Sequence, residues 1–201
     1  MKPVQALSTP VTLDVDENRR TRKYSPREQL LRVLWSLARP IFRFSPRPCF
    51  AWRRFLLRCF GASVGRHVHV YGSATVYLPW RLTIGDRSCI GEHAYIYNLG
   101  PVSIGSGVTI SQHAYLCAGT HDHTRAEMPL LKPPIRIGDL AWICAGAFIG
   151  PNVEVGAGAI VGARAVATRA VPAWTIVAGN PARFLKRRVV SEHSGTPPIR
   201  R

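Results

Sequence analysis

The sequence predicts an all-β protein built around a parallel β-coil of about five turns, with helices at its N-terminal end and a short helix at its C-terminal end. Residues 137–172 read as six consecutive blocks of six residues without an insertion. A fixed short period of this kind is the signature of a solenoid. The fifth residue of one block and the first residue of the next lie two positions apart, so both face the same side of an extended chain. Each block is therefore a short strand and a turn, and its inward residues stack from turn to turn.

The chain should begin with a disordered tail, residues 1–24, followed by a helix. Residues Ser25–Glu28 supply an N-cap serine, a proline in the first turn and a glutamate three residues after the cap. The helix should end at about Ala38, because Pro40 cannot continue it. Its apolar face would comprise Leu30, Leu31, Leu34 and Leu37.

Residues 25–61 form a basic amphipathic segment that contains a second predicted helix, from about Cys49 to Phe60. Aromatic residues alternate with arginines in this second helix. The ends of a solenoid must be capped, so both helices are expected to pack on the coil and close its open end. A face of aromatic residues and arginines also suits a membrane surface. Peripheral membrane contact through residues 26–60 is therefore the alternative.

The β-helix domain, residues 62–181, breaks its period along one edge. With three blocks to a turn, the turns start at Val64, Ile84, Ile104, Ile137 and Val155. Every departure from six residues then falls in the third block of a turn. The longest insertion, residues 119–134, is polar and rich in titratable side chains. Loops stacked on one face of a repeat array usually carry the function.

Basic residues concentrate outside the coil. Residues 1–61 hold 13 Lys and Arg against 4 Asp and Glu, residues 62–181 hold 8 against 6, and residues 182–201 hold 6 against 1. The last segment, 182–201, should be a short basic helix that closes the coil, followed by a tail. Basic flanks suit an anionic surface or ligand. The nearly neutral coil, with no recognised nucleic-acid module, argues against nucleic-acid binding.

The cysteines and the hydropathy pattern indicate a cytoplasmic protein, with peripheral contact to the inner face of the membrane as an option. There are five cysteines and no CxxC pair, which argues against a disulfide framework or a zinc site. The N-terminal residues contain no apolar signal core. No stretch approaches the ~18 apolar residues of a transmembrane helix.

Three features together resemble the left-handed parallel β-helix acyltransferases: the hexapeptide blocks, the loop sequence GTHDH and the ending VPAWTIVAGNPAR. The resemblance covers about residues 45–188 and is closest to the colanic-acid-biosynthesis (WcaF-like) O-acetyltransferases. It implies a left-handed coil and a homotrimer that binds acetyl-CoA and the acceptor in clefts between neighbouring coils. The implied reaction transfers an acetyl group to a hydroxyl of a sugar or lipid-linked saccharide in exopolysaccharide biosynthesis.

An alcohol needs a general base to attack acetyl-CoA at neutral pH, and histidine suits this role. His121 lies at an outward position at the start of the long insertion and matches the family's catalytic histidine. His123 is a weaker candidate, for acceptor binding. Glu127 is expected to orient His121 or to bind an acceptor hydroxyl. Asn98 is expected to assist the substrate or the intermediate, although strict counting places Tyr97 at that position.

The cofactor residues are also implied by the resemblance. The backbone N–H of Ala145 would stabilise the oxyanion of the intermediate, and Trp142 would lie beside the pantetheine arm or in the trimer interface. The remaining positions are Ala163 and Thr168 for pantetheine or adenine, and Arg169, Arg183 and Lys186 near the 3′-phosphate. Each basic residue could instead be a solvated charge.

No metal is expected. His93 and His113 occupy equivalent positions one turn apart and should stack. Their spacing differs from that of the metal-binding relatives with this fold, in which two histidine ligands lie five residues apart. The alternative to an enzyme is a non-catalytic β-helix scaffold that its basic helices anchor at a membrane surface.

Overall fold

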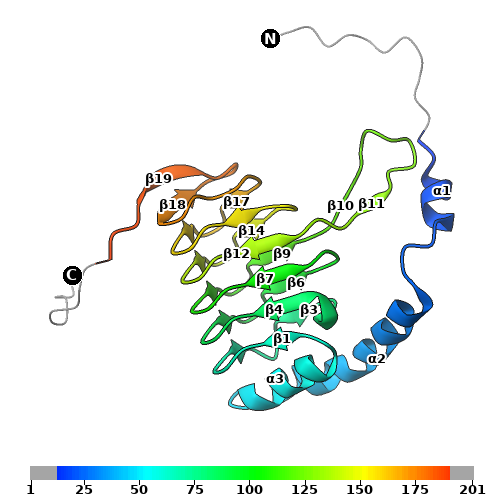
Figure 1. The fold of residues 1–201 in the computed structure, drawn as a ribbon, viewed down its shortest axis with the longest axis horizontal. Helices are drawn as coiled ribbons and strands as arrows, with labels where there is room; N and C mark the ends of the chain where they lie inside the picture. Colours follow the sequence, from blue (N-terminus) through cyan, green and yellow to red (C-terminus); the bar gives the residue numbers. More distant parts are fainter. Residues whose placement is uncertain (1–12, 191–201) are drawn as a thin grey trace, which may run out of the picture.

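The computed structural model describes residues 13–190, which form a three-sided β-helix with helices at its N-terminal end (Figure 1). The helices are α1 (Val15–Arg20), α2 (Pro26–Arg43) and α3 (Phe50–Cys59), and a single 3₁₀ turn covers Pro79–Arg81. The strands are two to five residues long and form three sheets around the coil, together with a two-stranded ribbon that leaves it.

Each sheet takes one strand from every turn. The first sheet contains β1 (Ser63–Val64), β4 (Leu82–Ile84), β7 (Val102–Ile104), β12 (Ile135–Ile137) and β15 (Glu154–Val155). The second contains β2 (His69–Val70), β5 (Cys89–Ile90), β8 (Thr109–Ile110), β13 (Trp142–Ile143), β16 (Ile160–Val161), β18 (Thr175–Ala178) and β19 (Arg183–Arg187). The third contains β3 (Thr75–Val76), β6 (Tyr95–Tyr97), β9 (Tyr115–Cys117), β14 (Phe148–Ile149) and β17 (Val166–Ala167).

The predicted turn starts are confirmed by the register of the first sheet. Parallel pairing aligns five residues in one column: Val64, Ile84, Ile104, Ile137 and Val155. The predicted inward pair of a block, Ala141 and Ile143, is buried. Gly138 shows why the second position of a block is often glycine, because a Cβ there would lie 2.5 Å from the backbone nitrogen of Ala157 in the next turn. Five turns are complete, and β18 with a bridge at Val171 begins a sixth.

Helix α2 begins as predicted but continues through Pro40, so the predicted end at Ala38 is wrong. Pro40 cannot donate a hydrogen bond to Ser36, but Ser36 is exposed and water can reach its carbonyl. Beyond the proline, Phe42 is buried against the coil and holds the last turn in place. The side chains that anchor α2 are Trp35 and Phe42, whereas three of the four predicted leucines, Leu30, Leu34 and Leu37, are exposed.

Helix α3, predicted from Cys49 to Phe60, lies across the open end of the first turn and caps it (Figure 1). Its Arg53 is fully buried and donates to the carbonyl oxygens of Val70 (2.5 Å), Pro46 (3.0 Å) and Arg47 (2.6 Å). Arg54 donates to Val68 and Arg58 to Val64 and Gly65, while Trp35 of α2 donates to Val76. The edge carbonyls of the first turn therefore have partners on all three sides, which confirms the predicted cap.

Two terminal predictions are wrong. Residues 183–187 form β19, not a helix, because they pair antiparallel with β18 after a turn that contains Gly179 at φ +94°. This pairing covers the edge of β18 that the coil leaves open. The predicted tail 1–24 is also wrong over residues 13–24, which contain α1; residues 1–12 and the predicted tail 191–201 lie outside the described part.

None of the helices between residues 13 and 190 is both long enough and apolar enough to cross a membrane.

The cap gives the first prediction. Arg53→Met should lower the free energy of unfolding by about 3 kcal/mol, because the buried carbonyl of Val70 and the part-buried carbonyls of Pro46 and Arg47 lose their side-chain donor. Chemical denaturation measures this loss. Arg27→Met in α2 removes an exposed arginine and should change stability by no more than about 0.5 kcal/mol. Equal stability of the two variants would contradict the assigned role of Arg53.

Candidate active site

The long insertion leaves the coil as a two-stranded ribbon. Strand β10 (Thr120–His121) pairs antiparallel with β11 (Leu130–Leu131), with His121 opposite Leu130. The ribbon follows β9 and precedes β12, so it emerges where the chain passes from the third sheet to the first (Figure 1). The predicted edge of insertions is thereby confirmed.

His121 is exposed and its ring is fixed by one hydrogen bond. Its Nδ1 lies 2.6 Å from the carbonyl oxygen of Met128. A carbonyl oxygen only accepts hydrogen bonds, so Nδ1 carries the proton and Nε2 of the neutral ring has a free lone pair. Met128 adopts φ +45°, and its N–H donates to Arg125 (3.1 Å). This turn aims the carbonyl at the imidazole.

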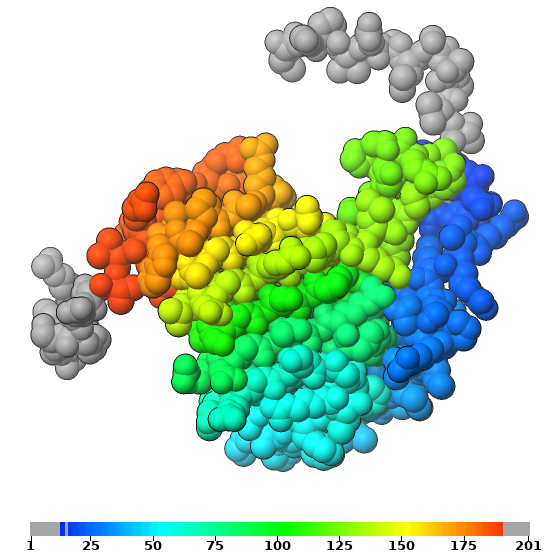
Figure 2. Space-filling view, viewed as in Figure 1, coloured from blue at the N-terminus to red at the C-terminus, as the bar shows by residue number. Residues whose placement is uncertain are grey.

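Helix α1 braces the tip of the ribbon, a contact that the sequence did not predict (Figure 2). The N–H of Asp14 donates to Ala126 (3.0 Å), and the side-chain amide of Asn18 donates to Glu127 (2.7 Å) and to Met128. The carbonyl of Met128 thus accepts from both Asn18 and His121. No periodic apolar pattern marks this segment, because backbone carbonyls, not apolar side chains, hold it.

A small cavity of about 220 Å³ opens beside the histidine ring. It is lined by Asn18, Arg19, His121, Glu127 and Met128. The Glu127 carboxylate forms an ion pair with Arg125 (3.1 Å) and none of its hydrogen bonds reaches His121. The expected role of Glu127 in orienting His121 is therefore wrong, because the Met128 carbonyl has that role. Its position on the cavity wall still permits contact with an acceptor.

Asp122 has a local structural role. Its carboxylate accepts hydrogen bonds from the side-chain hydroxyl of Thr124 (2.6 Å) and from the N–H of the same residue (3.0 Å). These two bonds lower the pKa of the Asp122 carboxyl below its ordinary value. The carboxylate is therefore directed into the turn of the loop.

Asn98 does not reach the surface, so its expected role in catalysis is wrong. The side chain is fully buried, accepts from the N–H of Leu78 (2.9 Å) and donates to its carbonyl (2.5 Å). Both polar groups of the amide are thus occupied by the neighbouring turn. A short polar side chain in a loop between two turns can bond to the backbone of the neighbouring turn, or it can contact a ligand. The sequence could not distinguish these two uses.

Aromatic side chains cover the outer face of the third sheet next to the ribbon. They comprise Tyr77, Tyr95, Tyr97, Tyr115 and Phe148, with neighbouring ring centroids 5.1–6.5 Å apart. Partial burial raises the pKa of Tyr97 and of Tyr115, so both phenols stay protonated. The ring of Tyr97 would lie 3.2 Å from a Cβ placed on Gly119, two residues before His121. The repeated tyrosines at outward strand positions were the available signal for this surface.

The residues expected to bind acetyl-CoA lie on the upper turns of the coil, those nearest its C-terminal end. The Trp142 side chain is 43% exposed on the second sheet, and its Nε1 donates to the hydroxyl of Ser111 (2.9 Å). Ala145 and Ala163 occupy equivalent corners of successive turns, joined by a bond from the N–H of Arg164 to Ala145 (2.9 Å). Within residues 13–190, the N–H of Ala145 has no backbone acceptor.

The remaining donor positions are exposed and fall in two places. Thr168 and Arg169 follow β17 in the fifth turn. They lie at the same corner of the coil as the ribbon, which emerges after the third turn. Arg183 and Lys186 lie on β19, opposite Ala178 and Ile176 of β18. Arg169, Arg183 and Lys186 thus place basic side chains at the C-terminal end of the coil, above Trp142.

One chain does not bring the histidine and the free N–H together. His121 stands at the corner between the third and first sheets, whereas Ala145 lies at the corner between β13 of the second sheet and β14 of the third. A strand of the third sheet separates the two corners.

The stacked histidines are as predicted. The rings of His93 and His113 are 5.1 Å apart and nearly parallel, at 9°. In the part of the chain that the structure describes, no group of three or more histidine, cysteine or acidic side chains is placed to hold a metal ion.

Relatives are found over most of the chain, although no family model matches the sequence. It is 38% identical over 162 residues to the protein named "Putative colanic acid biosynthesis acetyltransferase WcaF" of Escherichia coli (strain K12), an alignment that covers 81% of this chain and 89% of that protein. A hexapeptide-repeat acetyltransferase of Vibrio cholerae complexed with acetyl coenzyme A superposes with a TM-score of 0.77 at 25% identity, covering 87% of this chain and 96% of that one.

A galactoside acetyltransferase in complex with coenzyme A has a TM-score of 0.71 at 21% identity, covering 90% of this chain and 92% of that one. This likeness shows a common fold. These superpositions confirm the parallel β-helix fold that the sequence resemblance implied.

The buried amide gives the second prediction. Asn98→Ala should lower the free energy of unfolding by about 2 kcal/mol, because it leaves the buried N–H of Leu78 without a partner and removes one of the two hydrogen bonds that the Leu78 carbonyl accepts. Thermal or chemical unfolding measures the loss. Gln112→Ala, at an exposed turn, is the matched control and should leave stability within about 0.5 kcal/mol. If both variants were equally stable, Asn98 would not be a structural clamp.

Proposed function

The chain belongs to the family of hexapeptide-repeat acetyltransferases that includes WcaF, and we propose that it acetylates a hydroxyl of a sugar or lipid-linked saccharide in exopolysaccharide biosynthesis, with acetyl-CoA as donor. The observation that carries this proposal is the geometry of His121. Its Nδ1–H is donated to the Met128 carbonyl, which leaves Nε2 free to accept a proton beside a cavity.

In the proposed reaction, His121 acts as general base. Its Nε2 takes the proton of the acceptor hydroxyl as that oxygen attacks the thioester carbonyl of acetyl-CoA. The tetrahedral intermediate then collapses, the carbon–sulfur bond breaks, and the imidazolium returns its proton to the leaving thiolate. The products are the acetyl ester and CoA with a free thiol.

The Met128 carbonyl supports both halves of this cycle. It fixes the tautomer that presents a basic Nε2, and it accepts the Nδ1–H of the imidazolium that forms during attack. In serine hydrolases a carboxylate occupies the corresponding position. A neutral carbonyl orients the ring without placing a charge next to Nδ1.

The intermediate needs a donor for its oxyanion, and we assign this role to the N–H of Ala145 in a neighbouring chain. That N–H is free of backbone partners, and a backbone donor is already fixed in position when the charge develops. A homotrimer that packs the ribbon of one coil against the upper turns of the next would join Ala145 to His121. The separation of the two groups within one chain supports this arrangement.

Coenzyme A is proposed to follow the upper turns of that neighbouring coil. Trp142 offers an exposed ring to the pantetheine arm, and Ala163 continues the corner that begins at Ala145. Thr168 would contact the adenine end. The phosphates would meet the exposed basic side chains at the end of the coil, Arg169, Arg183 and Lys186, because guanidinium and ammonium groups bind phosphate well.

The acceptor is proposed to lie along the aromatic face of the third sheet. Tyr97 stands at the base of the ribbon, and its neighbour Tyr77 bonds through its hydroxyl to Arg32 (3.0 Å). Aromatic rings with polar tips can stack on a sugar ring and bond to its hydroxyls. Glu127 on the cavity wall would accept a bond from a sugar hydroxyl.

The third prediction concerns the base. His121→Ala should lower kcat by about 10²–10⁴-fold, the usual contribution of a general base, while acetyl-CoA binding stays unchanged. Release of the CoA thiol with a panel of sugar acceptors measures turnover, and calorimetry measures binding. His123→Ala, two residues away on the same loop, is the control and should retain most of the activity. Undiminished turnover by His121→Ala would overturn the mechanism, and absence of saturable acetyl-CoA binding by the parent would favour the scaffold.

A further inference from the structure

Helix α2 has two apolar faces, and only one of them packs on the coil. Trp35 and Phe42 supply the buried face. The second face, here called the exposed apolar face, has side chains that are 44–80% exposed: Leu30, Val33, Leu34, Leu37, Ile41 and Phe44. Their spacing of mostly three or four residues aligns them along one side of the helix.

Helix α3 adds two aromatic rings to this end of the molecule. Trp52 and Phe55 are exposed, with ring centroids 5.7 Å apart. Helix α3 already covers the open end of the coil, so the outer sides of both helices face away from the β-helix (Figure 1). Apolar surface gathered in this way usually marks an interaction site.

The same segment is strongly basic. Residues 26–60 contain eight arginines and one acidic residue, Glu28. Arg53, Arg54 and Arg58 cap the coil, and Glu28 is paired with Arg81 (2.5 Å). Within residues 13–190, neither Arg39 nor Arg43 has a hydrogen-bond or ion-pair partner. Helix α2 therefore carries two positive charges, on Arg39 and Arg43, that no group of the described chain neutralises.

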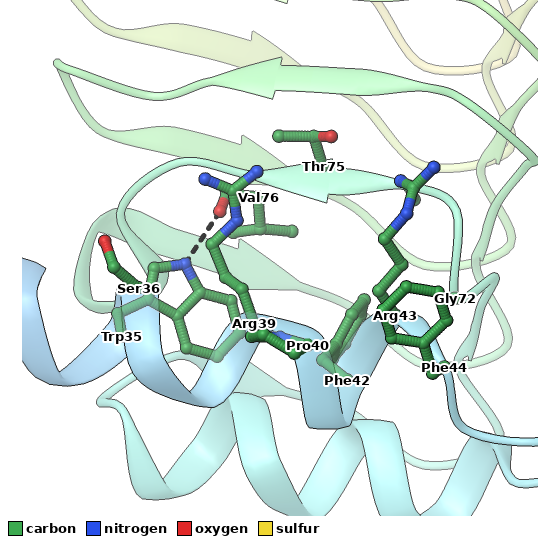
Figure 3. A pocket seen from close by; sticks show the side chains of 11 residues that line it. Trp35, Ser36, Arg39, Pro40, Phe42, Arg43, Phe44, Gly72, Thr75 and Val76 are labelled. Atoms are coloured by element: carbon green, nitrogen blue, oxygen red, sulfur yellow. Dashed lines mark hydrogen bonds between the residues drawn. The ribbon is translucent and has the colours of Figure 1, made fainter.

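Arg39 and Arg43 border a pocket of about 280 Å³ between α2 and the rim of the third sheet. Figure 3 shows both guanidinium groups on the same side of α2, beside Thr75 and Val76 of β3. The two arginines are one helical turn apart, where like charges repel. An anion between them would remove this repulsion, and a guanidinium fork matches the oxygens of a phosphate.

The pocket is continuous with apolar surface. Trp35, Phe42 and Phe44 contribute to its lining, and Phe44, at 80% exposed, also belongs to the exposed apolar face. A ligand that fills the pocket and continues past Phe44 would have a phosphate head and an apolar body. This combination is the chemistry of a phospholipid.

We propose that α2 and α3 dock this protein on an anionic phospholipid bilayer. The exposed apolar face lies at the acyl boundary, and the pocket of Arg39 and Arg43 receives the phosphate of a lipid headgroup. A basic amphipathic helix with aromatic residues binds such a surface through buried apolar area and charge attraction together. A second copy of the chain is a poorer occupant, because it would bring the same unpaired positive charge to the contact.

Docking would set the height of the ribbon above the membrane. The end that α3 covers would face the lipid, and His121 follows the third turn of the coil. Turns stack at about 4.8 Å and a helix is about 10 Å thick, so the imidazole would stand roughly 20 Å above the acyl boundary. Saccharide attached to a lipid could reach this height, whereas the lipid itself could not.

The fourth prediction tests the docking with the full chain, by sedimentation with phosphatidylglycerol and with phosphatidylcholine vesicles at about 0.1 M salt. The parent should sediment with the anionic vesicles and not with the neutral ones. Arg39→Gln/Arg43→Gln should weaken this binding about 30-fold, the effect of two arginines near an anionic surface. The charge-matched control, Arg87→Gln/Arg164→Gln on exposed turns of the coil, should weaken it less than about threefold.

A second pair of variants tests the exposed apolar face in the same sedimentation experiment. Leu37→Gln/Ile41→Gln should abolish sedimentation, while Val189→Gln/Val190→Gln, the same change at the other end of the molecule, should not. These side chains are exposed, so unfolding temperatures should match the parent and the acetylation of soluble acceptors should persist. Equal loss in the arginine pair and its control would overturn the phosphate pocket. Absence of parental sedimentation, or a smaller oligomer in Leu37→Gln/Ile41→Gln, would overturn the membrane assignment.

Discussion

The open edge of the first turn is the constraint on which the rest of the molecule depends. A β-helix satisfies its backbone between turns, so the first turn presents carbonyl groups with no strand beneath them. Here the side chains of Arg53, Arg54, Arg58 and Trp35 supply the missing donors. Because arginine offers several donors on a long apolar stem, a short helix can cap an edge that a further strand would otherwise have to cover.

The capping segment continues into the candidate active site. Helices α2 and α1 run from the base of the coil along its side to the ribbon (Figure 1). At the far end, Asn18 donates to the Met128 carbonyl, which in turn accepts from His121. The N-terminal arm thus ties the end of the coil to the loop that carries the base. It also leaves α2 with a free apolar face, which a cap alone would not need.

The sequence predicts the coil well because its signal is repeated. Inward positions recur every six residues, so the turn starts at Val64, Ile84 and Ile104 follow from counting alone. His121 was placed on the correct edge for the same reason. Single contacts have no such repetition. The predictions for the helix end near Pro40, the role of Asn98 and the secondary structure of β19 were wrong, because tertiary contacts determine each of them.

Polar side chains in the loop illustrate the limit most clearly. Asn98 and Glu127 have the composition of site residues, yet Leu78 occupies both polar groups of the former and Arg125 pairs with the latter. The group that holds His121 is a backbone carbonyl, which has no side-chain signature. Conversely, the tyrosines of the third sheet were visible as a pattern, but only stacked turns reveal that they form one surface.

The central claim is that each site combines His121 of one chain with the upper turns of its neighbour. Mixed trimers of His121→Ala and Trp142→Ala chains test it directly at acetyl-CoA concentrations well below saturation, where the loss of the base or of the binding contact should strongly impair each variant alone. Random assembly would give about a quarter of the sites an intact histidine and an intact tryptophan from different chains. Recovery of about that fraction of parental acetyl transfer is the predicted result. A mixture no more active than its separate components would show that both residues serve the same chain, and would contradict the account.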